Sequence, residues 1–261
     1  MSRFAKQIIL GAVGIAIAVA VFLLLQRTIN PPIPSPTPDP RTGLAPITIL
    51  SQQLLQVTDH SFDFVAKVRN PNTEYGSGDV QYELTAHHDG TGGNDNIEVV
   101  RRGSFYILPG QTKYLIVTPI TSANQLRTAK LAIKSVRWQS LDPLISQGVN
   151  LVVTDTSYVP QNSLGVFSKV GGAVLNNSNF DINQIDVSIV AVDAGDTPLA
   201  VSHTEIRTFL AKTKRGFEVS WFTPFAGTVA RVDAEANVNV FQNSALLHEY
   251  GGGGRERFQQ Y

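Results

Sequence analysis

The stretch SFDFVAKVRNPNTEYGSGDVQYELTA, residues 61–86, decides the fold class of this chain. In its first part, alternate positions are apolar and share one face of an extended chain: Phe62, Phe64, Ala66 and Val68. Its last part repeats the pattern with Val80, Tyr82, Leu84 and Ala86. A period of two, with aromatic and β-branched residues, is typical of half-buried strands in an antiparallel sheet. KYLIV (113–117) and KLAIKSVRW (130–138) continue the pattern, so the sequence predicts an all-β fold beyond residue 46.

The same order of segments occurs twice. AKVRNPNTEYGSGDVQYELTAHHDG (66–90) is similar to GAVLNNSNFDINQIDVSIVAVDAG (172–195). Further along, LPGQTKYLIVTP (108–119) is similar to LAKTKRGFEVSWFTP (210–224). A repeat of about 100 residues has the size of a small β-sandwich. We predict two tandem antiparallel β-sandwiches over residues 46–155 and 156–249, followed by a flexible glycine-rich tail over 250–261.

The repeated unit resembles the immunoglobulin-like (Ig-like) sandwich modules of bacterial surface proteins, the FxLYD type in particular. More distantly, it is similar to late-embryogenesis-abundant type 2 and CARDB-like domains. The first copy carries the resemblance in Val68 to Asn72 and Leu108 to Thr112, and the second copy in Val174 to Ser178, Asp193 to Gly195 and Leu210 to Val219. The resemblance covers about residues 47–245. It implies an Ig-like fold with a binding or structural role and no inherited catalytic residues.

A long apolar segment precedes the sandwiches. Residues 8–25, IILGAVGIAIAVAVFLLL, carry no charge, and an α-helix of that length spans about 27 Å, close to the hydrocarbon core of a bilayer. Arg3 and Lys6 precede the segment, and only Arg27 follows it closely. The positive-inside rule therefore predicts a single-pass anchor within residues 1–27, with a cytoplasmic N-terminus and an extracytoplasmic bulk. The alternative is a cleaved signal peptide, which usually has a shorter apolar core and a small-residue cleavage site.

Three alanines of this segment, Ala12, Ala16 and Ala20, lie on one face of the predicted helix. Small residues at this spacing let a second helix approach closely, so a homo-oligomer through this face is one hypothesis. Alanine is also common in membrane spans, and we favour that simpler explanation of the spacing.

Residues 28–45 form a proline-rich linker, with six of the 14 prolines between positions 31 and 40. Such a segment favours extended polyproline II and could hold the first sandwich up to ~50 Å from the membrane. SH3-type partners are cytosolic, so a spacer explains this outward-facing segment better than a ligand for them.

Composition excludes several classes of function. The chain has no cysteine, which excludes disulfides, thiolate zinc sites and thiol catalysis. Its net charge is zero, and beyond residue 27 there are 18 basic against 21 acidic residues. That balance gives no reason to expect a nucleic-acid partner.

The sequence shows no recognisable catalytic, cofactor or metal site. His87 and His88 are adjacent on a predicted strand and point to opposite faces, so we expect solvent-facing residues at a strand end. The loop 89–98 is rich in oxygen ligands but lacks EF-hand spacing, and calcium binding there stays open. Gly76-Ser77-Gly78 misses the nucleophile-elbow spacing, and we expect it in a turn.

One surface patch is a candidate contact site. If Phe222 faces outward and joins Phe225 beside Pro224, the three residues make an apolar patch for a partner. Core packing is the more ordinary role for such aromatic residues. Asn176-Asn177-Ser178 fits an N-glycosylation sequon, but the same residues are explained as a turn.

Together these patterns predict a membrane-anchored, extracytoplasmic, non-catalytic protein. It would bind another envelope protein or serve as a structural scaffold of the cell envelope or a surface assembly. The alternative is a membrane-tethered carbohydrate-binding module or enzyme, which would need exposed aromatics and carboxylates on one sandwich face. The sequence leaves open whether the outer compartment is a periplasm or the cell exterior.

Overall fold

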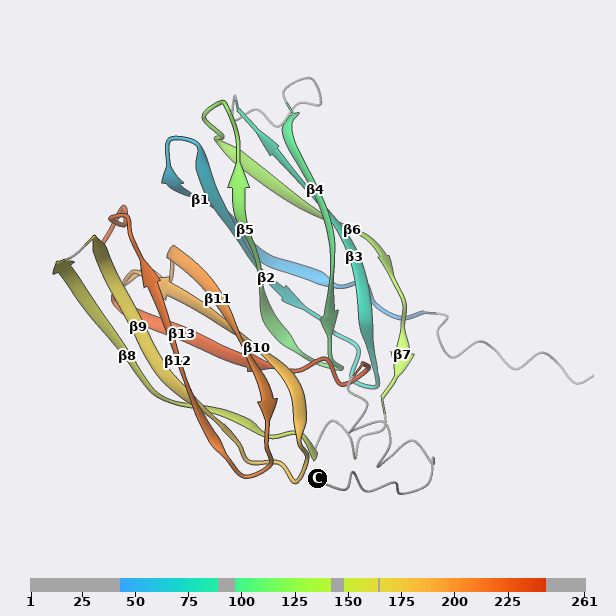
Figure 1. Cartoon of the computed structure of the whole chain (residues 1–261). Coiled ribbons are helices and arrows are strands. Elements are labelled where there is room, and N and C mark those ends of the chain that lie inside the picture. Colours follow the sequence, from blue (N-terminus) through green and yellow to red (C-terminus); the bar gives the residue numbers. More distant parts are fainter. Residues whose placement is uncertain (1–42, 89–96, 142–147, 164, 243–261) are drawn as a thin grey trace, which may run out of the picture. The chain divides into compact units, whose positions relative to one another are not determined.

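The computed structural model describes residues 43–88, 97–141, 148–163 and 165–242, which form thirteen β-strands (Figure 1). The first seven are β1 (Thr48–Thr58), β2 (Ser61–Arg69), β3 (Tyr75–His87), β4 (Ile97–Ile107), β5 (Thr112–Thr121), β6 (Thr128–Val136) and β7 (Gln139–Ser140). The other six are β8 (Leu151–Ser163), β9 (Val166–Asn176), β10 (Ile182–Val192), β11 (Pro198–Phe209), β12 (Lys214–Trp221) and β13 (Arg231–Asn237). The predicted all-β class is confirmed for this part of the chain.

The strands form four antiparallel sheets with a repeated topology. In the first half, one sheet has the order β1-β2-β5 and the other β4-β3-β6, with β7 added at the start of β3. In the second half, the orders are β8-β9-β12 and β11-β10-β13. Strands β8, β9 and β12 thus correspond to β1, β2 and β5, and strands β10, β11 and β13 correspond to β3, β4 and β6. The six-strand arrangement that β1 to β6 adopt therefore recurs in β8 to β13.

The first core lies between the two sheets of the first half. All four residues that alternate along 62–68 are buried in it, at 0–1% exposure, as predicted. Val80, Leu84 and Ala86 of β3 face them, and Tyr82 packs at the edge of the cluster. The alternation in the sequence thus marks the inward face of both sheets, and the apolar area buried there drives their association.

The second core repeats this arrangement. From one sheet it takes the inward residues of β9 and β12, including Val170, Val174 and Phe217. From the other it takes alternate residues of β10, namely Ile185, Val187, Ile189 and Ala191. The two core clusters share no residue, so each pair of sheets has a hydrophobic core of its own.

A buried asparagine ends the second strand of each half. Asn70 Nδ2 donates hydrogen bonds to the carbonyl oxygens of Tyr75 and Leu108, at 2.7 and 2.9 Å. Asn176 Nδ2 makes the corresponding bonds, at 2.8–3.2 Å, to the carbonyl oxygens of Phe180, Phe209 and Leu210. Each Oδ1 accepts from the N–H two residues later, which is the predicted turn chemistry. Because the Asn176 side chain is buried and bonded, the sequon serves as a turn in the folded chain.

Several predicted segments lie outside the described residues. They are the anchor with Ala12, Ala16 and Ala20, most of the proline-rich linker, the loop 89–96 and the tail over 250–261. Among the described residues, no helix has both the length and the apolar character that a membrane span requires. Strand β8 runs across residue 155, the predicted end of the first sandwich, so the chain enters the second pair of sheets before that position.

Candidate functional site

The outer faces of two sheets meet in a small apolar cluster, which we call the junction. The sheet β1-β2-β5 contributes Leu55, Val65 and Tyr114, and β10 and β11 contribute Val190, Val192 and Val201. Along β10, Val190 and Val192 alternate with residues of the second core and therefore point out of that sandwich. Both are 0% exposed, because the first sandwich covers them.

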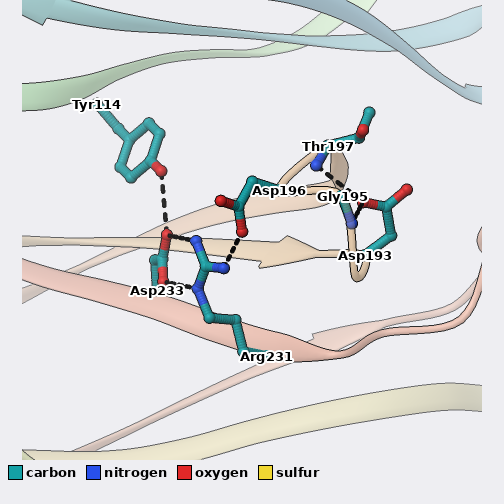
Figure 2. A network of polar contacts seen from close by, with 7 residues as sticks. All are labelled: Tyr114, Asp193, Gly195, Asp196, Thr197, Arg231 and Asp233. Carbon is teal, nitrogen blue, oxygen red and sulfur yellow. Dashed lines mark hydrogen bonds and ion pairs between the residues drawn. The ribbon is translucent and has the colours of Figure 1, made fainter.

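Hydrogen bonds accompany the apolar contact. The Tyr114 N–H donates to Glu235 Oε2 at 3.0 Å. The Tyr114 hydroxyl donates to Asp233 Oδ2 at 3.1 Å, as Figure 2 shows. Gln111 Nε2 donates to Asn237 Oδ1 at 2.7 Å. The three acceptors stand at alternate positions of β13 and share one face of that strand. Donors from the first sandwich thus meet a row of acceptors from the second.

Arg231 positions the first acceptor of this row. Its Nε lies 2.9 Å from Asp233 Oδ1, and its guanidinium also forms an ion pair with Asp196 (Figure 2). The hydrogen bonds from Arg231 lower the pKa of Asp233 below its usual range. Burial, together with the Asp233 carboxylate, raises the pKa of Tyr114 to about 12, so its hydroxyl remains a donor at neutral pH.

The turn between β10 and β11 holds Asp196 in place. Asp193 Oδ1 accepts hydrogen bonds from the N–H groups of Gly195 and Thr197, at 2.8 and 2.9 Å (Figure 2). Asp196 has a positive φ of 65°, a conformation that aspartate tolerates better than most residues. The turn at 193–196 ties the β10–β11 hairpin to β13 through Arg231.

A second contact joins the two halves beside the end of β13. Asn239 Nδ2 donates to the Gly78 carbonyl oxygen at 3.3 Å. A Cβ atom on Gly78 would lie 2.8 Å from Phe241 Cβ, and one on Gly76 would lie 2.8 Å from Phe241 Cζ. Gly76-Ser77-Gly78 belongs to strand β3, so its predicted place in a turn is wrong. These glycines let the chain after β13 pass close to β3.

A cleft of about 510 Å³ lies beside these contacts. Most of its lining comes from β4, β5 and β10, and the ionisable side chains that line it are Tyr106, Lys113, Tyr114, Asp186 and His203. β4 and β5 are edge strands of the two sheets of the first sandwich. The cleft therefore opens where that sandwich has no further strand to close its side.

Lys113, Tyr106 and Asp186 form the polar centre of the cleft. Lys113 Nζ lies 3.7 Å from the centroid of the Tyr106 ring, a cation–π contact, and the Tyr106 hydroxyl donates to Asp186 Oδ2 at 2.8 Å. Lys113 is only 6% exposed. Burial lowers the pKa of Lys113 to about 8, although the Asp186 and Glu235 carboxylates partly oppose this effect. The ammonium form therefore still dominates at neutral pH.

Two carboxyl groups at the junction have pKa values above their usual range, and burial is the main cause in both. For Glu235, the hydrogen bond from the Tyr114 N–H and the positive charge of Lys113 partly offset the effect on the pKa. For Asp63 of β2, the Thr118 hydroxyl and His203 do the same. The site thus combines one buried cation, carboxyl groups that are buried or half-buried and neutral hydrogen-bonding groups, which suits the binding of a small polar or charged group.

The three members of the predicted contact patch differ in exposure. Phe222 is 70% exposed and Pro224 is exposed as well. Phe225 is half-buried against the second core, with its ring edge-on to Trp221 and Phe167 at centroid distances of 5.5 and 5.1 Å. A contact role for Phe222 and Pro224 stays a prediction.

The two adjacent histidines lie on opposite faces of the strand end. His88 is exposed, as predicted, whereas His87 is 4% exposed, so the expectation that both face solvent is wrong for His87. Within the described ranges, no three His, Cys, Asp or Glu side chains gather closely enough to hold a metal ion.

Sequence reasoning missed the cleft and its lysine. In KYLIV, Lys113 is an ordinary polar residue at a strand start, and its partner Tyr106 stands in a strand whose alternation is weak. The Tyr106–Asp186 bond joins residues 80 positions apart. One feature of the sequence pointed to a contact at this place, namely the apolar run IVAV (189–192). In it, the residues between the core positions are also apolar, which indicates a strand that is buried on both faces.

Comparisons with known proteins add little to this description. The sequence matches no family model and no curated protein. Among solved structures, red sea bream transglutaminase is similar over 73% of this chain, with 14% identity and a TM-score of 0.22. This chain covers only 29% of the length of that protein. A likeness of this size bears on neither the fold nor the activity of this chain.

Proposed function

We propose that this chain is a membrane-anchored, extracytoplasmic protein without catalytic activity, which binds another envelope protein or serves as a structural scaffold. In this proposal residues 8–25 cross the cell membrane once, and residues 28–45 hold the folded part away from the bilayer. The two sandwiches act as tandem Ig-like modules of the FxLYD type.

The observation that supports a scaffold most is the junction. Two modules joined by a linker alone are expected to reorient freely. Here Val190 and Val192 are fully buried between the sandwiches, and Tyr114 is hydrogen-bonded to Asp233 and Glu235 across the same contact. Such a junction gives the pair one continuous surface, which suits a spacer or a platform for a partner.

The small number of exposed aromatic residues favours a scaffold over a carbohydrate-binding module. Sugar-binding faces usually present aromatic rings for stacking. Among the described aromatic side chains, Phe222 is the one that is largely exposed. A single ring does not make a platform, so the polar cleft is the remaining support for a tethered carbohydrate-binding module or enzyme.

Membrane extraction and protease protection test the proposal on the full chain in cells. We expect the protein to stay in the membrane pellet after alkaline extraction, and protease added to spheroplasts to digest the sandwiches while an N-terminal epitope survives. Replacing Ile15 and Ile17 by Arg should release the protein, since each arginine at a helix centre costs about 2.5–3.5 kcal/mol of insertion free energy. Gln26→Arg, at the end of the apolar run, is the matched control and should leave the protein in the pellet. Sandwiches that resist protease until the spheroplasts are lysed would contradict the proposed orientation.

A further inference from the structure

The Lys113 ammonium group lacks the partner that a buried charge normally has. In the described part of the chain, Nζ makes a cation–π contact with the Tyr106 ring, and no hydrogen bond or ion pair reaches it. The side chain is 6% exposed, and the Nζ atom itself still reaches solvent, where its three N–H donors are free for a ligand. A lysine in this position therefore presents three donors toward the cleft that it lines.

The nearby carboxylates are engaged elsewhere. Asp186 Oδ2 accepts from the Tyr106 hydroxyl, and Glu235 Oε2 accepts from the Tyr114 N–H. Neither carboxylate lies within 4.0 Å of Lys113 Nζ, the limit for an ion pair. Both attract the ammonium at longer range, which keeps it charged without satisfying its donors.

Apart from Asp186 and His203, the remaining lining of the cleft is uncharged. Ser104, Ser188, Gln184 and Asn239 line the cleft alongside Lys113, and Leu115 and Ile116 provide apolar contact. One cation beside mostly uncharged hydrogen-bonding groups can hold a small monoanion. Asp186 in the same lining disfavours dianions such as phosphate, because repulsion grows with the charge of the ligand.

We propose that this cleft binds a carboxylate group, with Lys113 Nζ as its ion-pair partner. The carboxylate belongs either to a small organic acid or to the C-terminal end of a polypeptide, and both offer the same oxygens to the ammonium. This inference goes beyond the proposed scaffold function and does not depend on the membrane anchor, since every residue it uses lies in the folded part.

Sodium acetate is the probe for the first test. The full chain, labelled with ¹⁵N-Lys and ¹⁵N-Tyr in detergent micelles, is titrated with acetate against chloride at equal ionic strength. We expect saturable shifts of the Lys113, Tyr106 and Tyr114 amide signals. The amide of Lys169, whose Nζ is paired with Glu218 at 2.9 Å, should not shift. Shifts that chloride reproduces, or that never saturate, would overturn the proposal.

Variants then assign the binding to Lys113. Lys113→Met keeps the length of the apolar stem and should weaken acetate binding at least about tenfold at the Tyr106 signal, as expected for a lost charged hydrogen bond. Lys169→Met is the matched control and should bind like the original chain. Asp186→Asn retains an acceptor for Tyr106 and removes the repulsion, but it also removes a carboxylate that raises the pKa of Lys113. Its effect is therefore measured at about pH 6, where the ammonium stays charged and acetate binding should tighten. Unchanged binding in Lys113→Met, or weaker binding at about pH 6 in a folded Asp186→Asn protein, would show that the ammonium is not the partner.

Peptides separate the two sources of the carboxylate. Trialanine with a free C-terminus is compared with trialanine amide. Tighter binding of the free peptide than of acetate assigns the cleft to polypeptide ends, and binding of acetate alone assigns it to small acids. Equal binding of the free and amidated peptides would contradict carboxylate recognition.

Discussion

Lys113 shows how strand parity and position together decide the environment of one residue. It shares a face of β5 with Leu115 and Val117, which belong to the first core, so parity directs its side chain inward. As the second residue of the strand, it lies where the sandwich opens on the cleft, and it can keep its charge near Asp186. The folded chain holds this ammonium with a pKa of about 8, against 10.5 for an unperturbed lysine.

This difference predicts a pH dependence of stability. Between about pH 8 and pH 10.5 the unfolded chain binds more protons than the folded chain, so the free energy of unfolding should rise with pH. From pH 8 to pH 10 we expect a gain of roughly 2 kcal/mol from this group. Denaturant unfolding of the original chain and of Lys113→Met measures it, and the variant should lack the rise. Above pH 10 the raised pKa of Tyr114 acts in the opposite direction, so the comparison ends there. Parallel pH profiles for the two proteins would disprove the assignment.

At the scale of strands, cross-strand pairs of glycine and an aromatic residue occur in both halves. Gly172 of β9 pairs with Phe217 of β12, and Gly103 of β4 pairs with Tyr82 of β3. A Cβ atom on Gly172 would lie 2.5 Å from Phe217 Cζ, so the ring lies over the glycine. We expect Gly172→Ala to lower the free energy of unfolding by about 1–3 kcal/mol, because the buried ring must leave its position. The neighbouring Gly171→Ala is the matched control. Its Cβ would have its nearest atoms at 3.9 Å, so this variant should leave the free energy of unfolding nearly unchanged. Equal thermal stability of the two variants would contradict this packing.

The strands that could be predicted from the sequence are those with one face in a core. Phe62, Phe64, Leu84 and Leu115 alternate cleanly, and each lies where its pattern placed it. Strand β1 has one buried residue, Leu55, and that residue faces the junction instead of the core, so its segment shows no clear period. The turns at Asn70 and Asn176 could be predicted because asparagine bonds its own backbone locally. The cleft could not, because it depends on contacts between residues far apart in the chain.

At the scale of the whole folded part, two cores and one junction account for most of the buried apolar residues. The junction is the smallest of the three, and it uses the outward faces of β2, β5 and β10, whose inward faces already fill the cores. Each sandwich therefore has what it needs to stay folded if the junction opens. Coupled unfolding of the two sandwiches would depend mainly on the junction, with the contacts at Gly78 and between Tyr106 and Asp186 beside it.

Val190→Asp tests this dependence. The residue is 0% exposed in the junction, and a carboxylate there would be buried without a partner, so the sandwiches should separate while both cores persist. In scanning calorimetry of the full chain, we expect the single transition of the original protein to split into two, the first at a temperature lower by several degrees. Val159→Asp makes the same change at a site that is 45% exposed on β8, and it should leave one transition near the original temperature. A single, strongly lowered transition in Val190→Asp would mean instead that neither sandwich is stable without the other, and the pair would then be one cooperative domain with two cores.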